Sequence, residues 1–178
     1  MKLSDIKTGW TVLVSTRNKE LPKIIQWFQK IVSKLGYKYN HAMVAWWAYG
    51  RLFFIEADKY GIAITPFEDY SDNLKYELLV LIPKFEVDGV EYGKFMLPFC
   101  GHAKYDKWNL LIAQPVSIIS DGEIWLGGKE NNKKFICAEW VYFVNKHFHP
   151  ELFPKQPERI CPANLFDNEN FTHENLVF

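Results

Sequence analysis

The chain has 178 residues, enough for one domain with a substantial core and too few for two comfortable ones. Hydrophobic residues make up 48% of it and aromatic residues 17%, which excludes a largely disordered chain. The 21 basic and 21 acidic side chains give a formal net charge of zero, so no electrostatic footprint for nucleic acid or an anionic membrane is indicated. We expect a single domain over residues 1–178 that binds no nucleic acid.

The first predicted element is a short buried strand over Trp10–Ser15, which is rich in β-branched residues. A helix is predicted over Pro22–Leu35, where apolar side chains recur at helical spacing between an initial proline and a closing glycine. From Asn40 the pattern is that of two strands joined around Gly50-Arg51 as a hairpin. A strand, a helix and a hairpin are therefore expected in this order.

Two further strands follow, "GIAITPF" ending at Pro66 and "YELLVLIP" ending at Pro83. The segments Val90–His102 and Asp106–Ala113 are helical candidates, and "DGEIWLGGKENN" is a glycine-punctuated loop. A consecutive block of strands with helices before and after it predicts an α+β fold, with a mostly antiparallel sheet and helices packed on it.

The last clear helix begins near Cys137, runs to about His147 and is closed by Pro150. The rest of the chain is expected to be loop-like, with a short turn at "CPANLFD". At a helix N-terminus, unpaired N–H groups and the helix dipole favour a thiolate. A lone cysteine is nevertheless most often a small buried residue, so position alone does not make Cys137 a nucleophile.

A thiolate nucleophile needs a base, and the base needs an orienting partner. His41 opens a strand, and Glu56 is a lone charge on the apolar strand across the hairpin, near the same end of the sheet. Cross-strand neighbours on one face can form a hydrogen bond, and a buried carboxylate needs a partner. We expect the two side chains to pair, although an ordinary buried His–Glu pair explains the pattern equally well.

Cys100, Cys137 and Cys161 form no Cys-x-x-Cys pattern and are expected to be free thiols in a reducing compartment. His102 follows Cys100 by two residues, but no second pair at zinc-finger spacing supports a metal site. No secretory peptide and no apolar run of membrane-spanning length is visible, which predicts a cytoplasmic protein with no membrane span.

The ordered motifs "NHAMVAWW", "FFIEAD", "GIAITPFEDY", "YELLVLIP", "HAKYDKWNL", "FICAEWVYFV" and "ICPANLFDNENF" cover nearly the whole chain. Together they resemble the circularly permuted branch of the NlpC-type papain-like cysteine peptidases, the YiiX/YebB-like group. Lecithin:retinol acyltransferase-like proteins are more distantly similar. The resemblance implies a permuted papain-like fold, with the histidine before the cysteine in the chain; order along the chain is irrelevant to a site assembled in space.

The resemblance also implies roles for single residues. Cys137 matches the nucleophile, His41 the general base and Glu56 the residue that orients the histidine. Tyr105 matches a tyrosine expected near the active site, supporting the oxyanion pocket. The chain departs from the pattern at Ala138, where a serine is usual, and at Trp10, where an aspartate is usual.

The sequence therefore predicts a cysteine hydrolase that cleaves an amide through a thioacyl-enzyme, without a metal or organic cofactor. Its expected substrate is a small peptide, amide or acyl compound, with cell-wall-type peptides suggested by the resemblance. Three alternatives remain: a lipid-directed acyltransferase or thioesterase with the same triad, a non-catalytic binding module, and a metalloenzyme using His41, Glu56 and Cys137 or His102. Nothing in the sequence indicates an oligomeric state.

Overall fold

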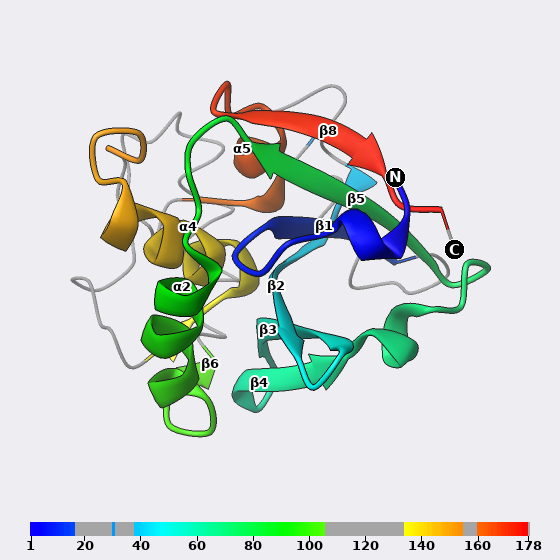
Figure 1. The fold of residues 1–178 in the computed structure, drawn as a ribbon, viewed down its shortest axis with the longest axis horizontal. Helices are drawn as coiled ribbons and strands as arrows, with labels where there is room; N and C mark the ends of the chain where they lie inside the picture. The colour runs from blue at the N-terminus through cyan, green and yellow to red at the C-terminus, as the bar shows by residue number, and fades with distance from the viewer. Residues whose placement is uncertain (17–29, 31–37, 106–133, 155–159, 178) are drawn as a thin grey trace.

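The structure is a computed structural model that describes residues 1–16, 30, 38–105, 134–154 and 160–177 (Figure 1). Three predicted elements lie wholly or almost wholly outside these ranges. Apart from Lys30, the helix expected over Pro22–Leu35 lies outside the described residues, as do the helical candidate at 106–113 and the glycine-punctuated loop at 121–132.

A six-stranded antiparallel sheet with strand order β4-β3-β2-β1-β5-β8 forms the centre of the described structure. Its strands are β1 (Thr11–Thr16), β2 (His41–Ala48), β3 (Arg51–Asp58), β4 (Gly61–Pro66), β5 (Tyr76–Pro83) and β8 (Phe171–Asn175). The four strands predicted between Asn40 and Pro83, together with the one predicted near Trp10, correspond to five of these six, so the expected antiparallel sheet is confirmed. The sheet twists across Figure 1 with β8 at one edge and β4 at the other.

The turn between β2 and β3 comes one residue earlier than predicted, at Tyr49 and Gly50. Both have positive φ, 52° and 73°, as the favoured two-residue hairpin turn requires. This short turn sets the register of the hairpin, in which Ala48 pairs with Arg51 and Met43 with Glu56.

Two helices, α2 (Gly89–Met96) and α4 (Cys137–Phe148), lie together beside the sheet in Figure 1. The predicted helix at Cys137 is confirmed. The segment predicted as Val90–His102 is shorter: α2 gives way to the 3-10 helix η4 (Leu97–Phe99), which contains Pro98. The Asp88 carboxylate caps α2 by accepting from the backbone N–H of Val90 at 2.9 Å.

Apolar side chains are buried on both faces of the sheet, in two clusters. The larger cluster includes the buried side chains of α4. Among them, Trp140 is fully buried and donates its indole N–H to the carbonyl of Ile55 at 3.2 Å. The smaller cluster, on the other face, packs Phe54 against the aromatic rings of η3 (Phe67–Tyr70). The strands therefore lie between two apolar layers. This explains why their sequences contain continuous apolar runs, because the side chains on both faces of the sheet are buried.

The C-terminal region is more ordered than the loop-like chain that the sequence predicts, so that expectation was wrong. Residues Pro162–Phe166 form the short helix α5, and β8 pairs with β5. In β8 only Phe171 is buried, and the following polar side chains are exposed. A strand without apolar alternation is invisible to a pattern search, and its pairing with β5 was found only in the tertiary structure.

A separate two-stranded parallel sheet pairs β6 (Lys104–Tyr105) with β7 (Lys134–Phe135). The remaining short 3-10 helix is η1 (Leu3–Asp5). Among the described residues, no helix has both the length and the apolar character needed to cross a membrane.

Candidate active site

His41 begins β2 at one end of the sheet, where it pairs with Val14 of β1. Glu56 is the partner of Met43 across the hairpin. His41 is two residues before Met43, so it lies on the same face and is a diagonal neighbour of Glu56. The hydrogen bond predicted between these residues is present: it joins His41 Nε2 to Glu56 Oε2.

The Glu56 carboxylate is almost fully buried, with 3% of its side chain exposed. Besides His41, it accepts a hydrogen bond from the hydroxyl of Tyr70 at 2.7 Å, and the side chain of Thr65 is a further partner. Burial by itself raises the pKa of Glu56, but the charge and hydrogen bond of His41 and the hydroxyl donors outweigh it and lower the pKa. The site therefore holds Glu56 as a carboxylate.

The Tyr70 phenol is fixed as a donor in this network. Burial raises its pKa, and the neighbouring Glu56 carboxylate raises it further. The ring of Tyr70 also stacks edge-on against Tyr76, with centroids 5.1 Å apart, and against Phe54 at 5.8 Å. Tyr70 therefore stays protonated and points its hydroxyl at Glu56.

Cys137 is the first residue of α4 and is buried, with 5% of its surface exposed. The preceding residue, Ile136, has an extended backbone and is the N-cap of the helix. Its N–H donates to the Glu139 carboxylate at 3.1 Å, which closes the first turn. The first N–H groups of a helix have no partner within the helix, so those at Cys137 are available to an oxygen atom beside the thiol.

His41 also forms a hydrogen bond with Cys137, so the imidazole bridges the thiol and the carboxylate. With Nε2 engaged by Glu56, Nδ1 is the ring nitrogen left for the thiol. Burial lowers the pKa of His41, but the negative charges of Cys137 and Glu56 outweigh it and raise the pKa well above its ordinary value. The protonated imidazole is therefore favoured at neutral pH, in contact with Cys137.

The other cysteines lack this environment. Burial raises the pKa of the Cys100 thiol to about 11 and that of the Cys161 thiol to about 11. Cys161 donates to the side-chain oxygen of Asn164 at 3.0 Å, and Cys100 to the carbonyl of Met96 at 3.8 Å. Both stay protonated at neutral pH, whereas Cys137 has an imidazole beside it.

Tyr105 lies in β6, where it pairs with Phe135, two residues before Cys137. The backbone thus brings it near the start of α4, and its support of the oxyanion pocket stays a prediction. Sequence reasoning missed Tyr70, Thr65 and Glu139. Of these, only Glu139 has a local signal, because an acidic residue two positions after the start of a predicted helix is typical of a cap.

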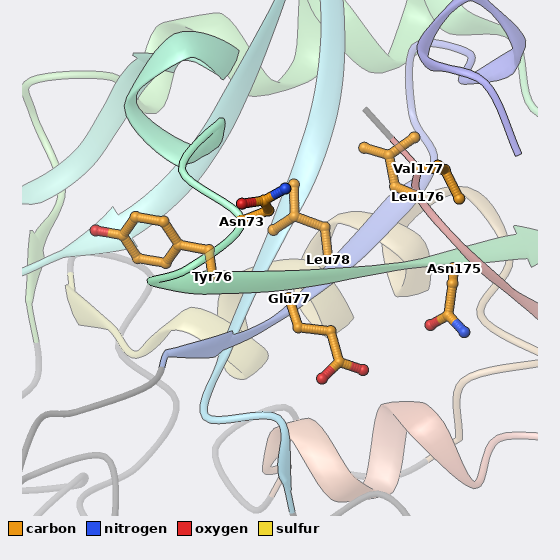
Figure 2. Close-up of a pocket in the computed structure, with 7 residues that line it drawn as sticks. All are labelled: Asn73, Tyr76, Glu77, Leu78, Asn175, Leu176 and Val177. Atoms are coloured by element: carbon orange, nitrogen blue, oxygen red, sulfur yellow. The ribbon is translucent and has the colours of Figure 1, made fainter.

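A cavity of about 220 Å³ opens at the same end of the sheet, between β5 and β8 (Figure 2). Its lining includes Tyr76, Glu77 and Leu78, and Leu78 pairs with the opposite side of Val14 from His41. In Figure 2 the side chains of Glu77 and Asn175 point to one side of this strand pair. The cavity thus lies across β1 from His41, and neither Cys137 nor Glu56 lines it.

The part of the chain that the structure describes contains no group of three or more His, Cys, Asp or Glu side chains arranged to hold a metal ion. His102, considered as a ligand beside Cys100, turns its Nδ1 to the carbonyl oxygen of Cys100 at 3.0 Å. At Cys137 the structure instead brings together a thiol, an imidazole and a buried carboxylate.

No protein-family model and no curated protein matches the chain. Among solved structures it is similar to the metalloprotein YiiX from Escherichia coli O157:H7, with a TM-score of 0.62 and 11% sequence identity. The match covers 94% of this chain and 96% of that one. At this identity the likeness concerns the fold, and it confirms the predicted α+β fold of YiiX type.

Proposed function

We propose that the chain is a cysteine hydrolase that cleaves an amide bond, with Cys137 as nucleophile, His41 as general acid and base, and Glu56 as the residue that orients His41. One observation carries the proposal: a single imidazole contacts both a buried carboxylate and a thiol at the first turn of a helix. A cysteine that only fills the core would need no imidazole beside it, and an ordinary buried His–Glu pair would need no thiol. The likeness of the fold to YiiX supports it as well.

In the first half-reaction the thiolate of Cys137 attacks the carbonyl carbon, and the carbonyl electron pair moves onto oxygen. N–H groups at the start of α4 stabilise the oxyanion that forms. Collapse of this intermediate expels the amine, which takes its proton from the His41 imidazolium. The product is a thioester on Cys137 and a neutral His41.

In the second half-reaction neutral His41 takes a proton from water, and the hydroxide attacks the thioester carbonyl. The tetrahedral intermediate expels Cys137 as thiolate and releases the carboxylic acid. His41 keeps the proton that it took from water, so the thiolate–imidazolium pair is restored. Glu56 remains ionised throughout and holds Nε2 of the ring, which keeps Nδ1 aimed at the reacting atoms.

The substrate class is a small peptide or other amide, with cell-wall-type peptides included because of the sequence resemblance. A lipid-directed acyltransferase or thioesterase would use the same three residues and differ only in its acyl donor. The name metalloprotein that YiiX carries points to a metal-dependent alternative. His41, Glu56 and Cys137 do not fit a metal site, because the two ring nitrogens of His41 are already engaged by the other two residues.

The proposal is tested by the rate at which iodoacetamide alkylates Cys137 at about pH 6, where an ordinary thiol of pKa about 8.5 is almost wholly protonated. We expect the wild-type protein to react faster than free cysteine, with the adduct located on Cys137 by mass spectrometry. The Cys137→Ala variant should lose this labelling, and His41→Ala should slow it to the rate of an ordinary buried thiol.

Cys100→Ala is the matched control, because its thiol has a raised pKa and no imidazole partner. It should be labelled at the wild-type rate. Labelling of wild-type Cys137 no faster than free cysteine would contradict the thiolate–imidazolium pair and with it the proposed hydrolase.

A further inference from the structure

The side-chain nitrogen of Asn40 is buried and has no hydrogen-bond partner. The whole residue is only 8% exposed, and it directly precedes His41. A buried donor without a partner is unfavourable in a folded protein and rare, so it needs an explanation. The other such atom in the described chain is Oγ1 of Thr11, the first residue of β1, whereas Asn40 lies near the end of that strand.

The backbone places Asn40 in line with β2. Its N–H donates to the carbonyl of Val14 at 2.9 Å, and Val14 is the residue of β1 that pairs with His41. Tyr39 before it and Ala42 after it both belong to the core cluster that also contains Ala138 of α4. Asn40 is therefore next to the part of the core that α4 covers.

The helix α4 runs from the start of β2 towards its end. At its N-terminus Cys137 contacts His41, the first residue of β2. Near its C-terminus, Asn145 accepts from the hydroxyl of Tyr92 in α2 at 3.3 Å, and the next residue of α2, Gly93, packs on Trp46 near the end of β2. The N-terminus of α4 thus lies over the start of β2, where Asn40 is.

We propose that the side-chain amide of Asn40 is a second oxyanion donor of this site, acting beside the backbone N–H groups at the start of α4. The inference rests on the proposed function. When the Cys137 thiolate attacks a carbonyl carbon, the developing negative charge falls on the oxygen atom, and two donors from different elements then converge on it.

An unpartnered donor suits this role. It has no hydrogen bond to break in the free protein, so it gains its partner when charge develops on the oxygen. The terminal torsion of an asparagine side chain is soft, which allows the amide nitrogen to turn towards the oxygen without moving the backbone. The unfavourable burial of the donor in the free protein is thereby offset in the transition state.

The test compares two reactions of the same thiol. p-Nitrophenyl acetate acylates Cys137 through an oxyanion: the thiolate attacks, p-nitrophenolate leaves, and a thioester forms. Iodoacetamide alkylates Cys137 by displacing iodide at a tetrahedral carbon, and no oxyanion arises. In Asn40→Ala we expect the acylation rate to fall about 100-fold, the usual effect of removing one oxyanion donor, with the alkylation rate within about twofold of wild type.

Asn40→Leu keeps the number and branching of the side-chain heavy atoms and removes the donor, so the same split is expected even if the alanine variant folds poorly. Thr11→Val is the matched control, because it removes the other unpartnered buried polar group and should leave both rates unchanged. A fall in acylation of less than about threefold, or an equal fall in alkylation in both variants, overturns the role of Asn40. Wild-type protein that is not alkylated selectively at Cys137 overturns the proposed function instead.

Discussion

At the scale of single residues, Glu56 organises the site. Its carboxylate is buried and would be strongly unfavourable alone, yet it has an imidazole and two hydroxyl groups as partners. His41 and Tyr70 bond to the same oxygen, Oε2, which leaves the carboxylate one orientation in which both bonds form. The position of the imidazole, and through it that of Nδ1, therefore depends on Tyr70.

Tyr70→Phe removes one donor and keeps the ring against Tyr76 and Phe54. We expect the rate of Cys137 acylation by p-nitrophenyl acetate to fall roughly tenfold, because a less constrained base is less often aligned. The free energy of unfolding should fall by about 1–2 kcal/mol, the usual effect of leaving a buried acceptor short of a partner. The acidic limb of the pH–rate profile should move to higher pH, since the lost hydroxyl helps to keep the pKa of Glu56 low.

Tyr60→Phe provides the control for this prediction, because Tyr60 is 80% exposed and its loss of a hydroxyl should change none of these quantities. An acidic limb that stays in place while only stability falls would make Tyr70 a structural residue without influence on Glu56.

At the scale of elements, the first turn of α4 carries the Cys137 thiol together with backbone N–H groups that have no partner within the helix. The turn is held by Glu139, which is 5% exposed and accepts from the N–H of Ile136. The indole of Trp140 fastens the same turn to β3 through the carbonyl of Ile55. The position of Cys137 is therefore set by the cap of the helix as well as by its packing.

Glu139→Ala should lower the free energy of unfolding by about 1 kcal/mol, the usual value of a helix cap, and should slow the alkylation of Cys137. Chemical unfolding and the iodoacetamide rate measure the two effects. Glu139→Gln should restore most of the stability, because an amide oxygen at this position accepts the same bond.

The corresponding acidic residue of α2 serves as comparison. Glu91 is in the first turn of that helix and is exposed, with Lys94 as its ion-pair partner. Glu91→Ala should change stability by less than about 0.5 kcal/mol and leave Cys137 reactivity as it is. Equal losses in the two alanine variants would mean that Glu139 contributes no more than a general first-turn charge.

At the scale of the whole molecule, antiparallel pairing brings the starts of β2 and β5 and the ends of β1 and β3 to one end of the sheet. His41, Glu56 and the cavity of Figure 2 all lie at this end, and α4 adds Cys137 to it. The His41–Glu56 pair thus forms only in the folded chain, and global stability should depend on pH through both groups.

The pKa of His41 is raised in the folded state, so its stabilising effect is complete below its ordinary value of 6.5 and is lost as pH rises through the folded pKa. The pKa of Glu56 is lowered, so its effect is complete above its ordinary value of 4.5 and is lost as pH falls through the folded pKa. Both contributions are therefore present in full between these two values.

We expect wild type to be more stable than Glu56→Gln by about 2 kcal/mol in this window, the usual value of a hydrogen bond between charged groups. The difference should shrink at lower and at higher pH. Urea unfolding of both proteins over a pH series measures it. A difference that stays constant across the series would show that the charges of the pair do not contribute.

Much of the fold was open to prediction from local patterns. The five strands with apolar runs, the helix at Cys137 and the hairpin between β2 and β3 follow from spacing and turn chemistry within short windows. The strand β8 was not predicted, because its exposed polar side chains show no alternation of apolar and polar residues. Its position is set by its pairing with β5. The end of α2 before Pro98 shows the limit of boundary prediction where a 3-10 turn continues a helix.

Local patterns in the sequence were enough to predict that Cys137 begins a helix and that His41 and Glu56 lie near the same end of a hairpin. The exact register of that hairpin follows from the turn at Tyr49 and Gly50, one residue earlier than predicted. Three further features became known from the three-dimensional structure: the first turn of α4 lies beside His41, Tyr70 donates to Glu56, and the side-chain nitrogen of Asn40 is buried without a partner. These contacts join segments far apart in the chain, and packing of the helix on the sheet, which no local pattern encodes, brings them together.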